Sequence, residues 1–182
     1  MKNSSLRTDI RYECIHILRA VEEQEVFVRE LLSKRCSRGD LSERDKRLLT
    51  ELAQGVIRHR LSLDTLISSF FFFLLASIEP WILYSLLIGL YQIIYLDRIP
   101  SSAAVNTSVE LVKKLIRRAD AVKFTNAVLR SVERSIHNKS AHAAEITDLQ
   151  KALHKRENTW CTFHSPIFPN PGEYLSSYLA MH

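Results

Sequence analysis

Residues 80–114 read PWILYSLLIGLYQIIYLDRIPSSAAVNTSVELVKK. The first part is almost wholly apolar and begins at a proline, which suits the first turn of a helix, so it predicts a buried helix from Pro80 to about Tyr95. The polar residues 97–102 predict a turn followed by a helix cap. Beyond that turn, Val105, Val109 and Val112 recur at four- and three-residue spacing and predict a second, amphipathic helix.

The same helical spacing extends in both directions along the chain. Apolar residues recur every three or four positions within residues 10–21, 42–57 and 121–132, a shorter helix is expected around residues 25–34, and Ser42 is a plausible N-cap. No alternating pattern typical of a strand occurs before residue 136. With only four glycines in 182 residues, a loop-rich all-β fold is disfavoured. We expect an all-α fold, a bundle of six or seven helices around one core.

Residues 66–96 have to be considered as a membrane span, because Glu79 is their only charged residue. A span needs about 20 unbroken apolar residues, and Glu79 with Pro80 divides this run, so two buried helices and no membrane segment are expected. The run of four phenylalanines, Phe70 to Phe73, is a candidate surface for a protein partner.

The expected location is the cytoplasm. The N-terminus has no apolar segment of the kind a signal peptide needs, and the three cysteines have no CxxC spacing, which fits a reducing compartment.

The chain changes character near residue 137. Residues 137–158 are polar with weak helical periodicity, and residues 165–172 read SPIFPNPG, which is typical of an extended segment. We therefore expect a helical domain over residues 5–136 and an irregular, proline-containing tail over residues 137–182, which is a linker or an arm.

Charge suggests where an anionic partner binds. The chain carries 25 Lys and Arg against 20 Asp and Glu, and residues 97–136 carry eight basic but four acidic side chains. Lys113, Lys114, Arg117 and Arg118 form two like-charged pairs four residues apart, an arrangement that is unfavourable in an isolated helix and favours a phosphate-binding face. Arg130 follows in the next helix. The alternative is a solvated surface whose cations complement the helix dipole.

Residues for catalysis are missing. The chain has no glycine-rich nucleotide loop and no HExxH pattern, its four glycines are scattered, and its seven histidines show no metal-ligand spacing. No complete active site, metal site or cofactor site is therefore expected. Asn106 and Asn126 lie in otherwise apolar helical stretches and are expected to be buried residues that fix helix packing.

Three strings carry a family resemblance: LLTELAQGVIRHRLSLD (48–64), LLIGLYQIIYLDRIPSSAAVNTSVELVKK (86–114) and FTNAVLRSV (124–132). They resemble the NusB-like domain, and more narrowly the N-terminal RNA-binding domain of Sun-type bacterial cytosine-5 methyltransferases of small-subunit rRNA. The similarity covers about residues 7–136. It implies an RNA-facing role for Arg7 and Arg11 in the first helix, and for Arg58 and Arg60.

In that family, S-adenosylmethionine and the catalytic cysteines belong to a separate domain. This chain has neither the glycine-rich cofactor loop nor a Pro-Cys pair, so no catalytic role is carried over to it. The resemblance implies an RNA-binding domain of such a methyltransferase without its catalytic part. It also implies that residues 137–182 are a linker or arm leading towards the absent catalytic domain, and that the run from Phe70 to Phe73 is a candidate surface for that missing domain. Two other hypotheses stay open: a free-standing NusB-type antitermination factor that bridges RNA and a ribosomal protein, and a structural remnant with no affinity for RNA.

Overall fold

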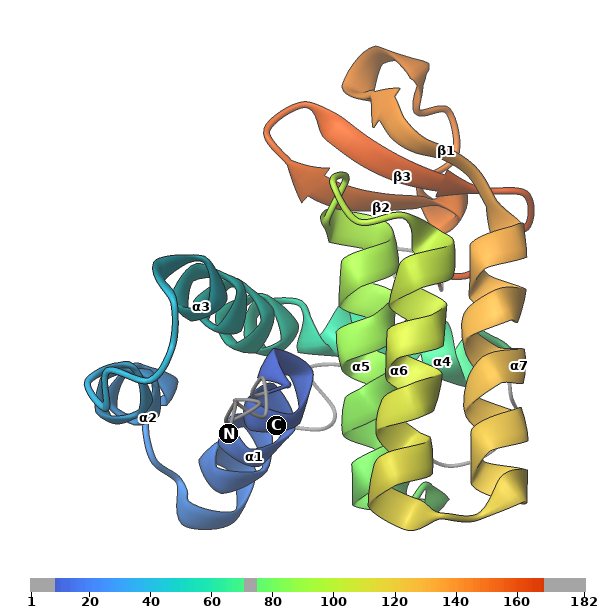
Figure 1. Ribbon diagram of the computed structural model, residues 1–182. Helices are drawn as coiled ribbons and strands as arrows, with labels where there is room; N and C mark the ends of the chain where they lie inside the picture. Colours follow the sequence, from blue (N-terminus) through green and yellow to red (C-terminus); the bar gives the residue numbers. More distant parts are fainter. Residues whose placement is uncertain (1–8, 71–74, 169–182) are drawn as a thin grey trace.

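The computed structural model describes residues 9–70 and 75–168 (Figure 1), and these form a helical bundle capped at one end by a small sheet. The helices are α1 (Ile10–Gln24), α2 (Val28–Cys36), α3 (Glu43–Arg58), α4 (Arg60–Phe70), α5 (Pro80–Tyr95), α6 (Ser101–Ile116) and α7 (Ala119–Ser135). The expected bundle of six or seven helices is confirmed. None of these helices is both long enough and apolar enough to cross a membrane.

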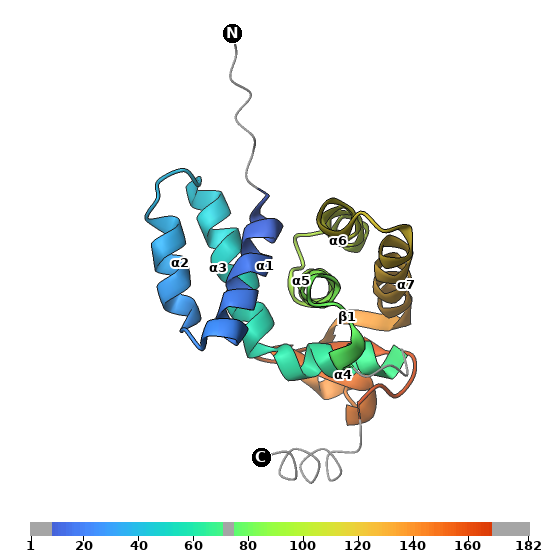
Figure 2. The same cartoon turned by 90° about the horizontal axis from the view of Figure 1, so that it is seen from below.

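Helix α5 is the centre of the bundle. It contacts α1, α3, α4, α6 and α7, and Figure 2 shows it between α1 on one side and α7 on the other. Its fully buried side chains include Leu86, Leu87, Ile88, Leu90, Ile93 and Ile94. The helix begins at Pro80 and ends at Tyr95, as its sequence predicts. The long apolar run is thus explained by burial on every side of one helix.

Local signals set the start of α3 and its contact with α5. Ser42 is the N-cap of α3, and its side chain accepts a hydrogen bond from the backbone N–H of Asp45, which confirms the expected cap. Further along, a side chain at Gly55 would overlap the ring of Tyr91. The Tyr91 hydroxyl donates a 2.6 Å hydrogen bond to Glu51. The two helices approach closely because α3 has no side chain at position 55.

The prediction of an irregular tail from residue 137 is wrong for residues 137–163, and the sheet that these residues form begins at Ile136, the last residue of the expected helical domain. Residues 136–163 form strands β1 (Ile136–His142), β2 (Ala152–Arg156) and β3 (Thr159–Phe163) in an antiparallel sheet of order β1-β3-β2, which Figure 1 shows at one end of the bundle. The strands are short and their exposed positions are polar, so the sequence resembles a linker. Leu153, Cys161 and Phe163 nevertheless pack into the core of the bundle. Residues 169–182 lie outside the described part of the chain.

A buried ion pair joins the sheet to the turn between α5 and α6. The Lys155 ammonium in β2 donates to Asp97 Oδ1 at 2.7 Å and to the carbonyl of Lys139 at 3.0 Å. Its side chain is 1% exposed, whereas that of Asp97 is 37% exposed. Arg156 donates to the other oxygen of Asp97 at 3.2 Å. Asp97 therefore anchors two cations of β2 on the bundle.

The three cysteines are free thiols in different environments. Cys14 in α1 and Cys161 in β3 are buried, and Cys36 at the end of α2 is half-buried. Burial raises the pKa of the Cys161 thiol to about 12. The two buried thiols are core side chains of the bundle and of the sheet, respectively.

Candidate nucleic-acid interface

The start of α1 and the end of α6 meet on one surface. Asp9 is the N-cap of α1, and the Lys114 ammonium lies 3.5 Å from its Oδ2. Lys113 and Arg117 are exposed on the same end of α6. We call Arg11, Lys113, Lys114 and Arg117 the α1–α6 basic face. The structure thus brings together two groups of residues that the sequence singled out for separate reasons.

Arg11 in this face is partly committed to the fold. Its Nε and Nη2 donate to Gln92 Oε1 at 2.9 and 2.7 Å, and the buried Gln92 side chain donates in turn to the carbonyl of Ile88. Burial lowers the pKa of the Arg11 guanidinium, although Asp9 opposes the shift. Arg11 therefore orients α1 on α5, and the lysines and Arg117 are the more accessible cations.

A row of aromatic rings runs along α1 to the start of α5. The rings of Tyr12 and His16 lie 4.5 Å apart, and those of His16 and Trp81 lie 5.3 Å apart, both edge-on. The Arg19 guanidinium carbon is 4.9 Å from the centre of the Trp81 ring. We call Tyr12, His16, Trp81 and Arg19 the aromatic ladder. Tyr12 is 42% exposed, so its ring is available to a base.

The sequence reasoning missed this ladder. Tyr12, His16 and Arg19 share one stripe of α1 because they are four and three residues apart, and that spacing is visible in the sequence. Trp81, by contrast, comes from the apolar start of α5, and only the packing of α1 on α5 places it beside His16.

The other predicted cations are dispersed, and most form shorter ion pairs than the 3.5 Å contacts of Lys113 with Glu110 and of Lys114 with Asp9. Arg60 contacts Glu22 and Asp64, and Arg130 contacts Glu133 at 2.8 Å. Arg118 contacts Glu79 at 3.3 Å and Asp120 at 3.2 Å.

Arg58 at the end of α3 is exposed and has no ion pair within residues 9–70 and 75–168. Arg7 lies outside the described residues. Within the phenylalanine run, Phe70 is half-buried and packs against the core, and residues 71–73 are outside the described part of the chain. The use of this run as a partner surface stays a prediction.

The expected burial of two asparagines is wrong. Asn106 in α6 and Asn126 in α7 are exposed. On α6 the buried positions include Val105, Ser108 and Val112, and position 106 turns away from them. Each asparagine is a polar residue on the solvent side of its helix, and neither fixes the packing.

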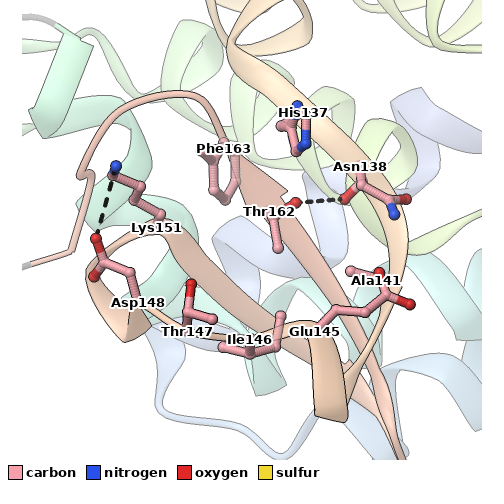
Figure 3. Close-up of a pocket in the computed structure, with 10 residues that line it drawn as sticks. All are labelled: His137, Asn138, Ala141, Glu145, Ile146, Thr147, Asp148, Lys151, Thr162 and Phe163. Carbon is pink, nitrogen blue, oxygen red and sulfur yellow. Dashed lines mark hydrogen bonds and ion pairs between the residues drawn. The ribbon is translucent and has the colours of Figure 1, made fainter.

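A small pocket under the sheet offers no catalytic arrangement. Figure 3 shows its lining, which includes His137, Asp148, Lys151 and Thr162, around a volume of about 250 Å³. The Lys151 ammonium is 3.8 Å from Asp148, and Thr162 donates to the carbonyl of Asn138. Asp148 and Lys151 pair with each other, and among the lining residues no nucleophile is hydrogen-bonded to a base.

The fold defines the class of protein. It is similar to the crystal structure of the antitermination factors NusB and NusE in complex with dsRNA, with a TM-score of 0.61 and 19% identity over 69% of this chain and 93% of that chain. It is also similar to a crystal structure of T. maritima NusB, with a TM-score of 0.60 and 16% identity over 69% of this chain and 88% of that chain. At such identities the likeness concerns the NusB-type fold alone.

The sequence then gives the family. A model of the NusB family matches residues 8–134, and the chain belongs to this family. It is 31% identical, over 128 residues, to the probable ribosomal RNA small subunit methyltransferase B of Bacillus subtilis, covering 70% of this chain and 28% of that protein. The Synechocystis protein of the same description is 31% identical over 135 residues, covering 74% and 29%. The chain thus spans under a third of the length of these relatives, and the resemblance seen in its sequence is confirmed.

Proposed function

We propose that this chain is the RNA-binding domain of a cytosine-5 methyltransferase of small-subunit rRNA, working in the cytoplasm where ribosomes mature. One observation carries the proposal: the α1–α6 basic face and the aromatic ladder both include residues of the first helix. Family membership and the methyltransferase relatives support the choice of substrate. In this proposal the S-adenosylmethionine site and the catalytic cysteines belong to a catalytic domain outside this chain.

The two parts of the interface have different physical roles. Lys113, Lys114 and Arg117 attract phosphates regardless of the RNA sequence. This attraction weakens as the salt concentration rises, because the release of counterions from the RNA is then less favourable. Tyr12, at the exposed end of the ladder, offers a ring face on which an unpaired base can stack. In our proposal Arg11 is a further RNA contact of this surface, and Arg7, which precedes α1 in the sequence, is another RNA-binding residue. Together they hold a structured RNA that also has unstacked bases.

The test measures binding to RNA hairpins transcribed from bacterial small-subunit rRNA. The test variant combines Lys113→Gln, Lys114→Gln and Arg117→Gln. The control variant combines Arg29→Gln, Lys34→Gln and Arg38→Gln, three exposed cations at the other side of α1, so the net charge changes equally. Fluorescence anisotropy is recorded from low to physiological salt, and circular dichroism checks the fold of each variant.

We expect the test variant to bind at least tenfold more weakly at low salt, with a slope of log affinity against log salt that is about 2–3 smaller. Tyr12→Ala should weaken binding without changing the slope, because it removes no charge. Equal losses in the test and control variants, or no affinity of the native chain for RNA, contradict the proposal. The latter result would favour a structural remnant.

The rival function is that of a free-standing antitermination factor. The coverage of 93% of the NusB chain in the complex with NusE favours it, because the bundle has nearly the whole of that fold. It predicts a stable complex with NusE, whereas our proposal predicts none. Gel filtration of the chain mixed with NusE separates the two.

A further inference from the structure

A second basic surface lies at the sheet end of the bundle. A groove of about 780 Å³ is lined by α3, the turn between α5 and α6, and β2. Figure 1 shows this turn beside β2. We call the four arginines around it, Arg44, Arg47, Arg98 and Arg156, the arginine groove. All four are exposed at its rim.

The carboxylates that line the groove are already engaged. Glu51 accepts the hydrogen bond of the Tyr91 hydroxyl, and Asp97 binds Lys155 and Arg156 of β2. Arg44, Arg47 and Arg98 have no hydrogen bond or ion pair from their side chains within the described residues. Three guanidinium groups thus line one groove without an ion pair of their own among the described residues, and they outnumber the one lining carboxylate, Glu51, that no cation binds. Arg44 and Arg47 are moreover neighbours one turn apart on α3, where like charges repel.

The side chain of Tyr95 is part of the lining of the groove. The residue is 9% exposed, its hydroxyl oxygen is buried, and within the described residues the hydroxyl has no hydrogen-bond partner. The centre of its ring lies 4.1 Å from that of His59 and 5.0 Å from that of Tyr91, and these stacked contacts fix its orientation. Because the hydroxyl is buried, it offers no donor to a ligand in the groove, and the arginines at the rim are the groups that contact phosphate.

We propose that the arginine groove is a second RNA site, which holds the phosphates of a single-stranded segment. This inference rests on the proposed RNA-binding function and adds a second binding site for the same RNA. Arginine forks bind phosphate oxygens in pairs, and the groove has an apolar floor of Leu48, Leu96 and Ile99 for ribose and base faces. The volume of the groove suits a few nucleotides of a single strand.

The position of the groove sets the length of RNA that reaches both sites. The groove lies at the N-terminal end of α6, and the last turn and C-cap of the same helix carry Lys113, Lys114 and Arg117. Helix α6 has 16 residues and is about 24 Å long at ~1.5 Å per residue. A stacked single strand that rises ~3.4 Å per nucleotide needs about seven nucleotides to cover this distance. Oligonucleotides of about 12 nucleotides should therefore contact both sites, and those of four nucleotides only one.

The experiment compares three triple variants of the full chain that lose the same charge. The groove variant is Arg44→Gln, Arg47→Gln, Arg98→Gln; the face variant is Lys113→Gln, Lys114→Gln, Arg117→Gln; the control is Arg29→Gln, Lys34→Gln, Arg38→Gln. Fluorescein-labelled RNAs of 12 and 4 nucleotides are the probes. For the 12-nucleotide probe we expect the groove variant to lose at least tenfold in affinity and about 2 in salt slope, against little change in the control.

Tyr95→Phe is a control for changes inside the lining. It removes a hydroxyl that is buried and keeps every arginine, so we expect the affinity for the 12-nucleotide probe and its salt slope to be unchanged. If Tyr95→Phe loses as much affinity as the groove variant, a disturbed interior and not the lost arginine charge weakens binding, and the inference is overturned.

The outcomes separate the two proposals. If the face variant loses affinity and the groove variant matches the control, the groove is not an RNA site and the proposed function stands. If only the groove variant loses affinity, the groove stands and the α1–α6 basic face is refuted. If a poly-glutamate peptide of the same charge displaces the 12-nucleotide probe as well as unlabelled RNA does, the groove takes acidic protein segments and the inference is wrong.

Discussion

The ion pair between Asp97 and Lys155 predicts a large and localised loss of stability. Asp97→Ala leaves the Lys155 ammonium, 1% exposed, with only the carbonyl of Lys139 as a partner. Breaking a buried pair by removing one partner costs about 3–5 kcal/mol. Because Asp97 itself is 37% exposed and one acceptor remains, we expect about 2–3 kcal/mol here. Asp97→Asn keeps an acceptor oxygen and should cost less.

Urea unfolding of two single-tryptophan proteins provides the assay. Trp160 in β3 reports on the sheet and Trp81 in α5 reports on the bundle, after Trp81→Phe or Trp160→Phe. With a slope of about 2 kcal/mol per molar urea, Asp97→Ala should lower the midpoint by about 1–1.5 M, and most for Trp160. Glu110→Ala is the control, because its contact with Lys113 is fully at the surface. If Asp97→Ala unfolds at the same urea concentration as Glu110→Ala, the sheet is not held by this pair.

Three further predictions concern the interior. Gly55→Ala overlaps the Tyr91 ring and should reduce the free energy of unfolding by about 1–3 kcal/mol; an unchanged or higher melting temperature would contradict the close packing. Burial lowers the pKa of His59 in the folded protein below its ordinary value of 6.5. As the pH falls, the unfolded chain therefore binds a proton at this histidine before the folded protein does. The contribution of neutral His59 to the free energy of unfolding is complete above pH 6.5 and decreases as the pH falls below it. His59→Phe should flatten the fall between about pH 7 and 5.5, and identical pH profiles would refute this. Arg35, 7% exposed, donates to Glu13 at 2.8 Å, and Arg35→Met should cost about 2–3 kcal/mol in urea unfolding, since it leaves that carboxylate half-buried and unpaired; a loss under 0.5 kcal/mol would count against it.

The helices were predictable because their signals are local. Pro80 and Ser42 mark helix starts within a few residues, and the apolar run of α5 is continuous. The sheet was not predictable from the sequence. Its strands are only five to seven residues long, and two register shifts interrupt the pairing of β1 with β3. Its stability depends on pairing between strands and on packing against the core of the bundle, and neither is a local property of the sequence. Lys155 illustrates this: its burial beside Asp97 has no counterpart in its sequence neighbourhood.

The candidate site also has one part that the sequence predicted and another that only the structure reveals. Charge spacing on one helix singled out Lys113, Lys114 and Arg117, because like-charged neighbours are visible in the sequence. Which cations are free was not visible, since the carboxylates that neutralise Arg60 and Arg118 include residues from other segments, Glu22 and Glu79. The aromatic ladder and the arginine groove combine elements distant in the sequence and needed the packed structure.

The alkylation rates of the three free thiols can report on local opening of the structure. Since only the thiolate reacts readily, Cys14 and Cys161 stay protected while the protein is closed, whereas the half-buried Cys36 is open to reagents. Pulsed alkylation followed by peptide mass mapping would give a separate modification rate for a helix of the bundle and for the central strand of the sheet. A common rate for Cys14 and Cys161 means that the two parts open as one cooperative unit. Faster labelling of Cys161 means that the sheet lifts from the bundle while the helices remain folded.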